Sequence, residues 1–416
     1  MPSLARAPRP VALELAPVEV AARCRHLPGL VFFDSAREEA GGANLSIVAA
    51  RPAEIVRGNL HRDSTRLEAA LHAHHRAPAD DGLPHGFAGG FVEYDGAFCF
   101  GIYEEALIFR HADQSWHEVG DLRSRLREPA SSAAIVAPHF TPRVSREQYC
   151  AMVVRAQEYI AAGDIYQVNL AHRFDTDWRG DAFAFYEALR HYSPAPFAAF
   201  LELGGRCALS SSPESFLKMS GRAVRTRPIK GTRPRRAEAT ADEKSAFDLI
   251  TSPKEVAELV MITDLERNDL GQVCEFGSVR ATELLKLERY EQVFHLVSTI
   301  EGQLRPDVDH LAALRACFPG GSITGAPKRR ARQIIAELER EPRGLYTGAI
   351  GWLGFNGESQ FNIAIRTVVI EDDRAHFHVG AGIVADSSPE REWQETLDKA
   401  AGILLAAELM GDMRND

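Results

Sequence analysis

Apolar residues recur along this chain with two periods, one typical of strands and one typical of helices. Short apolar runs between turn residues predict strands at residues 30–33, 45–48, 165–170, 197–203, 207–211 and 223–226. Helical periodicity predicts a helix from Ser145 to Gly163, with Ser145 and Gln148 at the two capping-box positions. Because strand signals follow one another and helices come later, the pattern predicts an α+β fold and not a doubly wound one.

The chain of 416 residues is long enough for two or three domains or one large interleaved unit. Residues 1–127 mix short strands with turn signals. Residues 128–144 are rich in Pro, Ala and Ser around Ile135-Val136, and we interpret them as a connection. Residues 145–416 form the second part. The glycine-rich stretch 85–91 lacks GxGxxG spacing, so it favours a tight sheet crossing over a phosphate loop.

Composition narrows the class of protein. A net charge of −10 with no basic patch argues against nucleic-acid binding, so local cations or a metal must hold any anionic substrate. The cysteines show no CxxC spacing, which argues against a zinc cage or disulfide framework and favours a reducing cytosol. We see no secretory signal and no apolar run of about 18 residues that would span a membrane.

Two predicted helices carry paired glutamates. The first begins at Ser252-Pro253 and is expected to end near Glu266; the second begins at Ser388-Pro389 and also carries Lys399. Residues three apart share a helix face. The paired glutamates are Glu255, Glu258, Glu392 and Glu395. They could converge on Mg²⁺, although helix capping and exposed charge explain the same spacing.

Glycine-rich loops and one arginine are candidates for binding an anion. The stretch 319–328 precedes an amphipathic helix, where backbone N–H groups can face an anion. Residues 380–382 are predicted to form a second glycine loop after a strand at 375–379. Arg366 ends an apolar strand, a position suited to clamping a carboxylate. Taken singly, each is better explained as a tight turn or a surface charge than as an anion site.

Lys230 lies between Pro228 and Gly231 in the stretch 227–232. Proline restricts the backbone and glycine permits a close approach, so Lys230 is held on a defined turn. Alone, it would be a solvated turn lysine.

Together these blocks resemble the chorismate-utilising enzymes, which include anthranilate, aminodeoxychorismate, isochorismate and salicylate synthases. The resemblance extends from about residue 145 to the C-terminus, and more loosely to Phe33-Asp34-Ser35 and residues 86–95. Its ordered blocks are residues 163–170, 212–214, 228–232, 264–270, 318–328, 346–351 and 380–386.

The resemblance implies a single α+β unit of two interleaved sheet-and-helix halves with the active site in a cleft. It implies Lys230 and Glu214 as catalytic groups, with Glu214 as the general acid. The four glutamates would bind Mg²⁺, chiefly through Glu258 and Glu395. Chorismate would contact Gln167, Thr232, His295, Ser322, Tyr346, Arg366, Gly380, Ala381, Gly382 and Lys399. Ser35 would mark a possible tryptophan pocket, which could bind feedback tryptophan, hold tryptophan structurally or be filled.

Two positions separate the family members. Family members that add water to the ring carry a lysine base where this chain has Gln167, so isochorismate and salicylate synthesis are not expected. Anthranilate synthases carry a small residue at the position of Lys230, whereas most aminodeoxychorismate synthases carry lysine, thought to form a covalent adduct with the ring. The expected activity is therefore that of aminodeoxychorismate synthase component I.

That activity makes 4-amino-4-deoxychorismate for 4-aminobenzoate and folate. Ammonia would come from a separate glutamine amidotransferase subunit and a separate lyase would act downstream, since we expect no room here for either as a fused domain. Two alternatives remain open: the anthranilate synthase large component, and a non-catalytic chorismate or tryptophan sensor.

Overall fold

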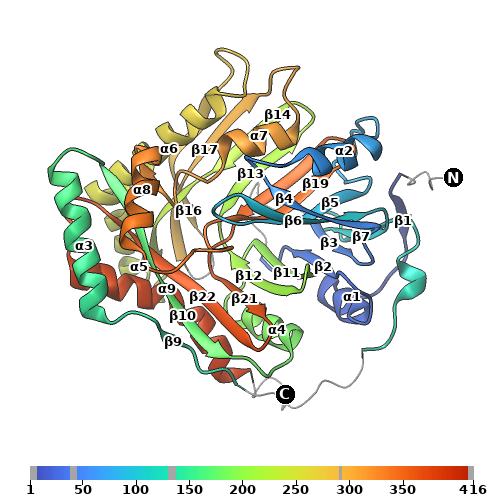
Figure 1. Cartoon of the computed structure of the whole chain (residues 1–416), viewed down its shortest axis with the longest axis horizontal. Coiled ribbons are helices and arrows are strands. Elements are labelled where there is room, and N and C mark those ends of the chain that lie inside the picture. The colour runs from blue at the N-terminus through green and yellow to red at the C-terminus, as the bar shows by residue number, and fades with distance from the viewer. Residues whose placement is uncertain (1–6, 38–44, 130–136, 290–292, 411–416) are drawn as a thin grey trace.

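The computed structural model describes residues 7–37, 45–129, 137–289 and 293–410, except the side chain of Thr232. Two large antiparallel sheets form the centre of the molecule and helices lie around them (Figure 1). The helices are α1 Pro17–Cys24, α2 Thr65–Ala73, α3 Arg146–Ala161, α4 Ala182–Tyr192, α5 Ala239–Ile250, α6 Pro253–Gly271, α7 His310–Cys317, α8 Lys328–Leu338 and α9 Pro389–Leu409, with a 3₁₀ turn at Arg123–Arg125. Among the described residues, no helix is long and apolar enough to cross a membrane.

The first sheet has 12 strands and the second has 10. In spatial order the first contains β1 Arg9–Val11, β8 Ser115–Val119, β7 Ala106–Arg110, β3 Leu45–Ala49, β2 Val31–Asp34, β11 Phe197–Leu203, β12 Arg206–Ser212, β21 Thr367–Glu371, β22 Arg374–Ile383, β10 Gln167–Asp177 and β18 Gly325–Ala326, with β9 Thr141–Pro142 beside β10. The second contains β15 Ile229–Pro234, β17 Val293–Gln303, β14 Ala223–Arg227, β13 Ser215–Ser220, β20 Glu358–Ile363, β19 Ala349–Gly354, β5 Phe87–Val92, β6 Ala97–Tyr103 and β4 Glu54–Asn59, with β16 Arg280–Arg289 beside β17.

Strands from both ends of the chain share each sheet. In Figure 1 the blue strand β5 runs beside the orange β19, with β6 on its other side, and β2 pairs with β11 in the other sheet. The predicted α+β class with two interleaved halves is therefore confirmed. The expected boundary at 128–144 stays a prediction, and Ile135-Val136 lie outside the described residues.

Three apolar layers hold this arrangement together. Between the sheets, Phe33, Phe87 and Trp352 pack in one cluster. The outer face of the first sheet is covered by apolar residues of α1, α4 and α9. The outer face of the second is covered by α2, α6 and α7. Helices α6 and α9, which carry the paired glutamates, are thus placed by burial of their apolar faces.

Local signals predicted most elements, with two corrections. The helix after Ser145 forms as expected, and its capping box with Gln148 is present. Helix α6 continues to Gly271, five residues beyond the expected end, because Leu270 is buried in the core. The expected loop at 380–382 is wrong: these residues lie inside β22 and pair with β10. Glycine is needed there for close packing, since a Cβ on Gly380 would lie 2.7 Å from the carbonyl oxygen of Leu170.

Candidate active site

A cavity of about 600 Å³ gathers most of the predicted site residues. Its walls come from β10, β15, β17, β22, the N-terminal half of α6, the first half of α9 and the loops that follow β12, α7, α8 and β20. The predicted residues that line it are Glu214, Lys230, Glu255, Glu258, His295, Ser322, Tyr346, Arg366, Gly380, Gly382, Glu395 and Lys399. A cavity of this size and polarity suits a small organic anion.

Lys230 reaches this cavity because β15 bulges beside it. The strand register shifts between Lys230 and Thr232, and Gly231 has a φ of +69°, a conformation that favours glycine. A Cβ on Gly231 would also lie 2.6 Å from Leu249 Cδ1. The Lys230 amine lies 3.8 Å from Glu258 Oε2. The predicted contact of the Thr232 side chain lies outside the described residues.

Glu214 is buried at the turn between β12 and β13. Its backbone N–H donates to Ser212 Oγ. Burial raises the pKa of Glu214, while the Ser322 hydroxyl and the charges of Lys230, Lys399 and Arg366 oppose that shift. The net effect favours a protonated carboxyl, which is what a general acid requires.

Arg366, Tyr346 and His295 present different polar groups to the cavity. Arg366 adopts a φ of +48° and its carbonyl accepts a hydrogen bond from Ser211 N. Tyr346 stacks on His378, with ring centroids 5.3 Å apart. Burial, aided by Arg366, lowers the pKa of His295 to about 4. His295 is therefore neutral near pH 7, and Arg366 supplies the positive charge on this side.

The glutamates of α6 and α9 approach each other across a lysine. Lys254 lies 4.0 Å from Glu258 and 3.2 Å from Glu392. Glu392 Oε1 also accepts from Ser387 Oγ. Burial raises the pKa of Glu258 against the opposing charges of Lys230 and Lys254. Lys254 thus supplies the positive charge between the two helices in this structure.

The other two glutamates pair separately. Glu255 lies 3.7 Å from Arg233, and Glu395 lies 2.8 Å from Lys399. Within the described residues, no three His, Cys, Asp or Glu side chains cluster closely enough to hold a metal ion. Binding of Mg²⁺ by the four glutamates therefore stays a prediction.

A protein-family model described as chorismate binding enzyme matches residues 45–405, which is most of the chain. The chain belongs to this family.

Similar proteins in this family carry two names. The chain is 38% identical over 356 residues to the anthranilate synthase component 1 of Methanothermobacter thermautotrophicus, covering 80% of this chain and 77% of that protein. It is 39% identical over 336 residues to the aminodeoxychorismate synthase component 1 of Bacillus subtilis, covering 77% and 70%. Matches with several further relatives cover only 55% to 58% of those proteins.

The fold of the family is also found among solved structures. The anthranilate synthase component I of Streptococcus pneumoniae superimposes with a TM-score of 0.77 at 31% identity, covering 88% of this chain and 94% of that chain.

Four of the site residues predicted from the sequence do not line the active-site cavity. Gln167 is buried beside it, and its Nε2 would be 2.4 Å from a Cβ on Gly382. Ala381 is fully buried in β22, and Glu392 is buried behind Lys254. Ser35 lies elsewhere, with its hydroxyl donating to the carbonyl of Leu45.

The predicted tryptophan pocket corresponds to a cavity of only about 30 Å³ beside Ser35, Asp34 and Trp352. That volume suits a water molecule and not an indole. The Asp34 carboxylate there already accepts hydrogen bonds from Tyr186 and Arg190. Of the three alternatives for this pocket, the small volume favours the filled one, and tryptophan binding there stays untested.

Several cavity residues were not predicted from the sequence. They are Asn169, Arg233, Lys254, His378, Arg391, Gln394 and Asp398. Lys254 follows directly after the proline that starts α6, which could have marked it as lying beside the glutamates. The others depend on how distant strands and α9 meet, which no local pattern reports.

Proposed function

We propose that this chorismate-binding enzyme aminates chorismate at ring carbon C4, the activity of an aminodeoxychorismate synthase component I. The observation that carries the proposal is the Lys230 amine in the same cavity as the buried acid Glu214. A lysine nucleophile and an acid for the leaving group are the two protein groups that the covalent route needs.

The charges of the cavity suit the substrate. Chorismate carries two carboxylates, and the chain as a whole carries a net charge of −10. Arg366 and Lys399 supply local positive charge that offsets this background. Arg366 would clamp one carboxylate, and the Tyr346 hydroxyl and the Ser322 hydroxyl would orient the ring substituents.

The proposed reaction has two substitutions. Neutral Lys230 attacks C2 of the ring, both ring double bonds shift by one position, and the 4-hydroxyl leaves as water after Glu214 protonates it. Ammonia then attacks C4, both double bonds shift back, and the Lys230 amine leaves C2. Each substitution has a lower barrier than direct replacement of hydroxide by ammonia.

Glutamates of α6 and α9 would hold Mg²⁺ in this scheme. Glu258 Oε1 and Glu392 Oε2 are buried and lack hydrogen-bond partners among the described residues, so carboxylate oxygens remain to bind a cation. Glu258 and Glu395 would be the main ligands, with Glu255 and Glu392 close by. Bound Mg²⁺ would neutralise the ring carboxylate of chorismate.

Gln167 supports ammonia over water as the nucleophile. Its Oε1 has no hydrogen-bond partner among the described residues, and an amide cannot remove a proton from water. The Gln167 carbonyl oxygen can instead accept a hydrogen bond from ammonia.

A partner component would supply the ammonia. The names of the similar proteins from M. thermautotrophicus and B. subtilis end in "component 1", which implies a second component. We propose a glutamine amidotransferase as that partner, and 4-aminobenzoate and folate synthesis, with a separate lyase, as the pathway.

Anthranilate synthesis is the second candidate, because several of the similar proteins carry that name. Both reactions use chorismate and ammonia, so binding alone does not separate them.

The experiment compares Lys230→Ala with Lys286→Ala, a matched change at an exposed lysine on β16 that pairs with Glu283.

The expected result is a loss of about 10²-fold or more in the ammonia-dependent rate for Lys230→Ala, with chorismate binding retained. The Lys286→Ala protein should behave as wild type. Unchanged turnover in Lys230→Ala would remove Lys230 from the nucleophile role. Tight chorismate binding without any turnover in the wild type would instead favour a sensor.

A further inference from the structure

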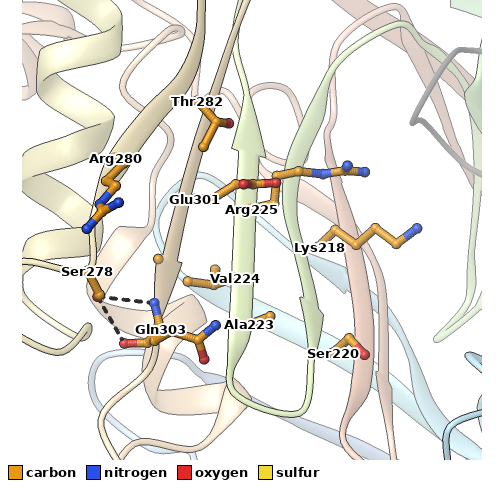
Figure 2. Close-up of a pocket in the computed structure, with 11 residues that line it drawn as sticks. Lys218, Ser220, Ala223, Val224, Arg225, Ser278, Arg280, Thr282, Glu301 and Gln303 are labelled. Atoms are coloured by element: carbon orange, nitrogen blue, oxygen red, sulfur yellow. Dashed lines mark hydrogen bonds between the residues drawn. The ribbon is translucent and has the colours of Figure 1, made fainter.

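A second cavity of about 590 Å³ lies away from the candidate active site, over β13, β14, β16 and β17. It is an open groove on one face of the second sheet, and Figure 2 shows the side chains that line it. The residues that line it are Lys218, Ser220, Ala223, Val224, Arg225, Ser278, Arg280, Thr282, Glu301, Gly302 and Gln303. Its volume is close to that of the active-site cavity and falls in the range of small-molecule sites.

Charged side chains cross the groove in a row. Lys218 pairs in register with Arg225, Arg225 with Glu301, and Glu301 with Arg280 on the edge strand β16. Neighbouring strands are about 4.8 Å apart, so the row extends about 14 Å. Three cations and one carboxylate line the groove, and Glu358 lies close enough to act on Lys218, so cations outnumber carboxylates here although the whole chain carries −10.

Lys218 is the strongest sign that this groove accepts a ligand. The side chain is half-buried, yet its amine makes no hydrogen bond or ion pair with any residue in the described part of the chain. Burial, with Arg225 directly opposite, lowers the pKa of Lys218, and Glu358 on β20 opposes that shift. An anion beside Lys218 would stabilise the protonated amine against both effects.

The hydroxyl groups of Ser278 and Ser220 in the groove already form hydrogen bonds within the protein. Ser278 Oγ donates to the carbonyl of Glu275 and accepts from Gln303 N (Figure 2), and Ser220 Oγ donates to Glu358. A ligand would therefore be recognised mainly by the cations and not by neutral donors.

We propose that this groove binds a small molecule with two or more anionic groups, carboxylates or phosphates. One group would lie between Lys218 and Arg225, and a second would reach Arg280. Glu301 separates the two positions, so a ligand with spaced charges is favoured over a single compact anion. This site is independent of the proposed chorismate chemistry.

The test is isothermal titration calorimetry of the full chain with pyrophosphate and, separately, with citrate, at constant ionic strength and without divalent metals. Variants are Lys218→Met, which keeps the apolar stem, and Arg280→Gln, a second change should Lys218→Met not fold. Lys286→Met on β16, outside the groove, is the matched control. Arg366→Gln removes a cation of the active-site cavity.

We expect at least one probe to bind the wild type, and Lys218→Met or Arg280→Gln to raise its Kd about tenfold or more. The control and Arg366→Gln should keep the wild-type Kd. Preference for pyrophosphate or citrate would assign the ligand to phosphates or carboxylates. The proposal would be overturned if neither probe bound the wild type, or if both groove variants kept the wild-type Kd. It would also be overturned if only Arg366→Gln lost binding of the probe.

Discussion

Glu266 is a buried acid that should make the stability of the protein depend on pH. It lies on α6, and its Oε2 accepts a hydrogen bond from Thr226 Oγ1 at 2.8 Å. Burial raises its pKa to about 8; Thr226 and Lys328 oppose that shift, whereas the carboxylates of Glu214 and Asp269 add to it. Folded Glu266 therefore holds its proton at pH values where the unfolded chain has lost it.

The sign follows from proton binding. The pKa of Glu266 is raised from 4.5. Below pH 4.5 the folded and unfolded states are both protonated, so the group does not change the stability with pH. As pH rises from there to about 8, the folded state binds more protons, so stability falls with rising pH. Each pH unit is worth at most about 1.36 kcal/mol, and less near either pKa, which gives a loss of about 3 kcal/mol between pH 5 and pH 8.

Glu266→Gln keeps the size of the side chain and an acceptor for Thr226 but cannot titrate. The assay is the thermal midpoint of wild type and variant at pH 5 and pH 8, at one scan rate. With about 2.1 cal/mol/K of unfolding entropy per residue, the wild type should lose about 3 °C relative to the variant. Glu243→Gln, an exposed change on α5, is the control and should show a constant difference. A pH-independent difference for Glu266→Gln, or a wild type that gains stability as pH rises, would refute the reasoning.

Three further predictions concern the site and the core. Glu214→Gln should lower the chorismate-dependent rate by about 10²–10⁴-fold. The wild-type rate should fall as pH rises through the raised pKa of Glu214, and the pH–rate profile of the variant should lack this fall. Glu258→Gln should raise the Mg²⁺ concentration for half-maximal rate by about tenfold or more, measured by metal titration; an unchanged Mg²⁺ requirement would exclude it as a ligand. Arg343→Met should cost about 3–5 kcal/mol in thermal or denaturant unfolding, because it leaves Glu339 buried without its ion-pair partner, and a wild-type melting curve would contradict this.

Local sequence signals predicted what depends on neighbouring residues. The start of α6 follows from Ser252, which caps the helix through Glu255 N, and from the proline at its first position. The end of α6 was placed too early because Leu270 is held by tertiary packing that a local pattern does not reveal.

The residues of the candidate site also divide into those marked by local sequence signals and those placed by tertiary contacts. Lys230 could be selected because Gly231 beside it marks a special backbone conformation, and the structure gives that glycine a positive φ. The strand at 380–382 was missed because its glycines are typical of loops, whereas pairing with β10 decides their conformation. The bridge from Lys254 to Glu392 could not be predicted, since it joins residues 138 apart in the chain.

The most direct test of the proposed function is the identity of the product. Wild-type protein would be incubated with chorismate, Mg²⁺ and an ammonium salt, without any lyase, and the products separated by chromatography and mass. We predict 4-amino-4-deoxychorismate, which retains the enolpyruvyl group and depends on Lys230. Fluorescent anthranilate, formed with release of pyruvate, would contradict the proposal.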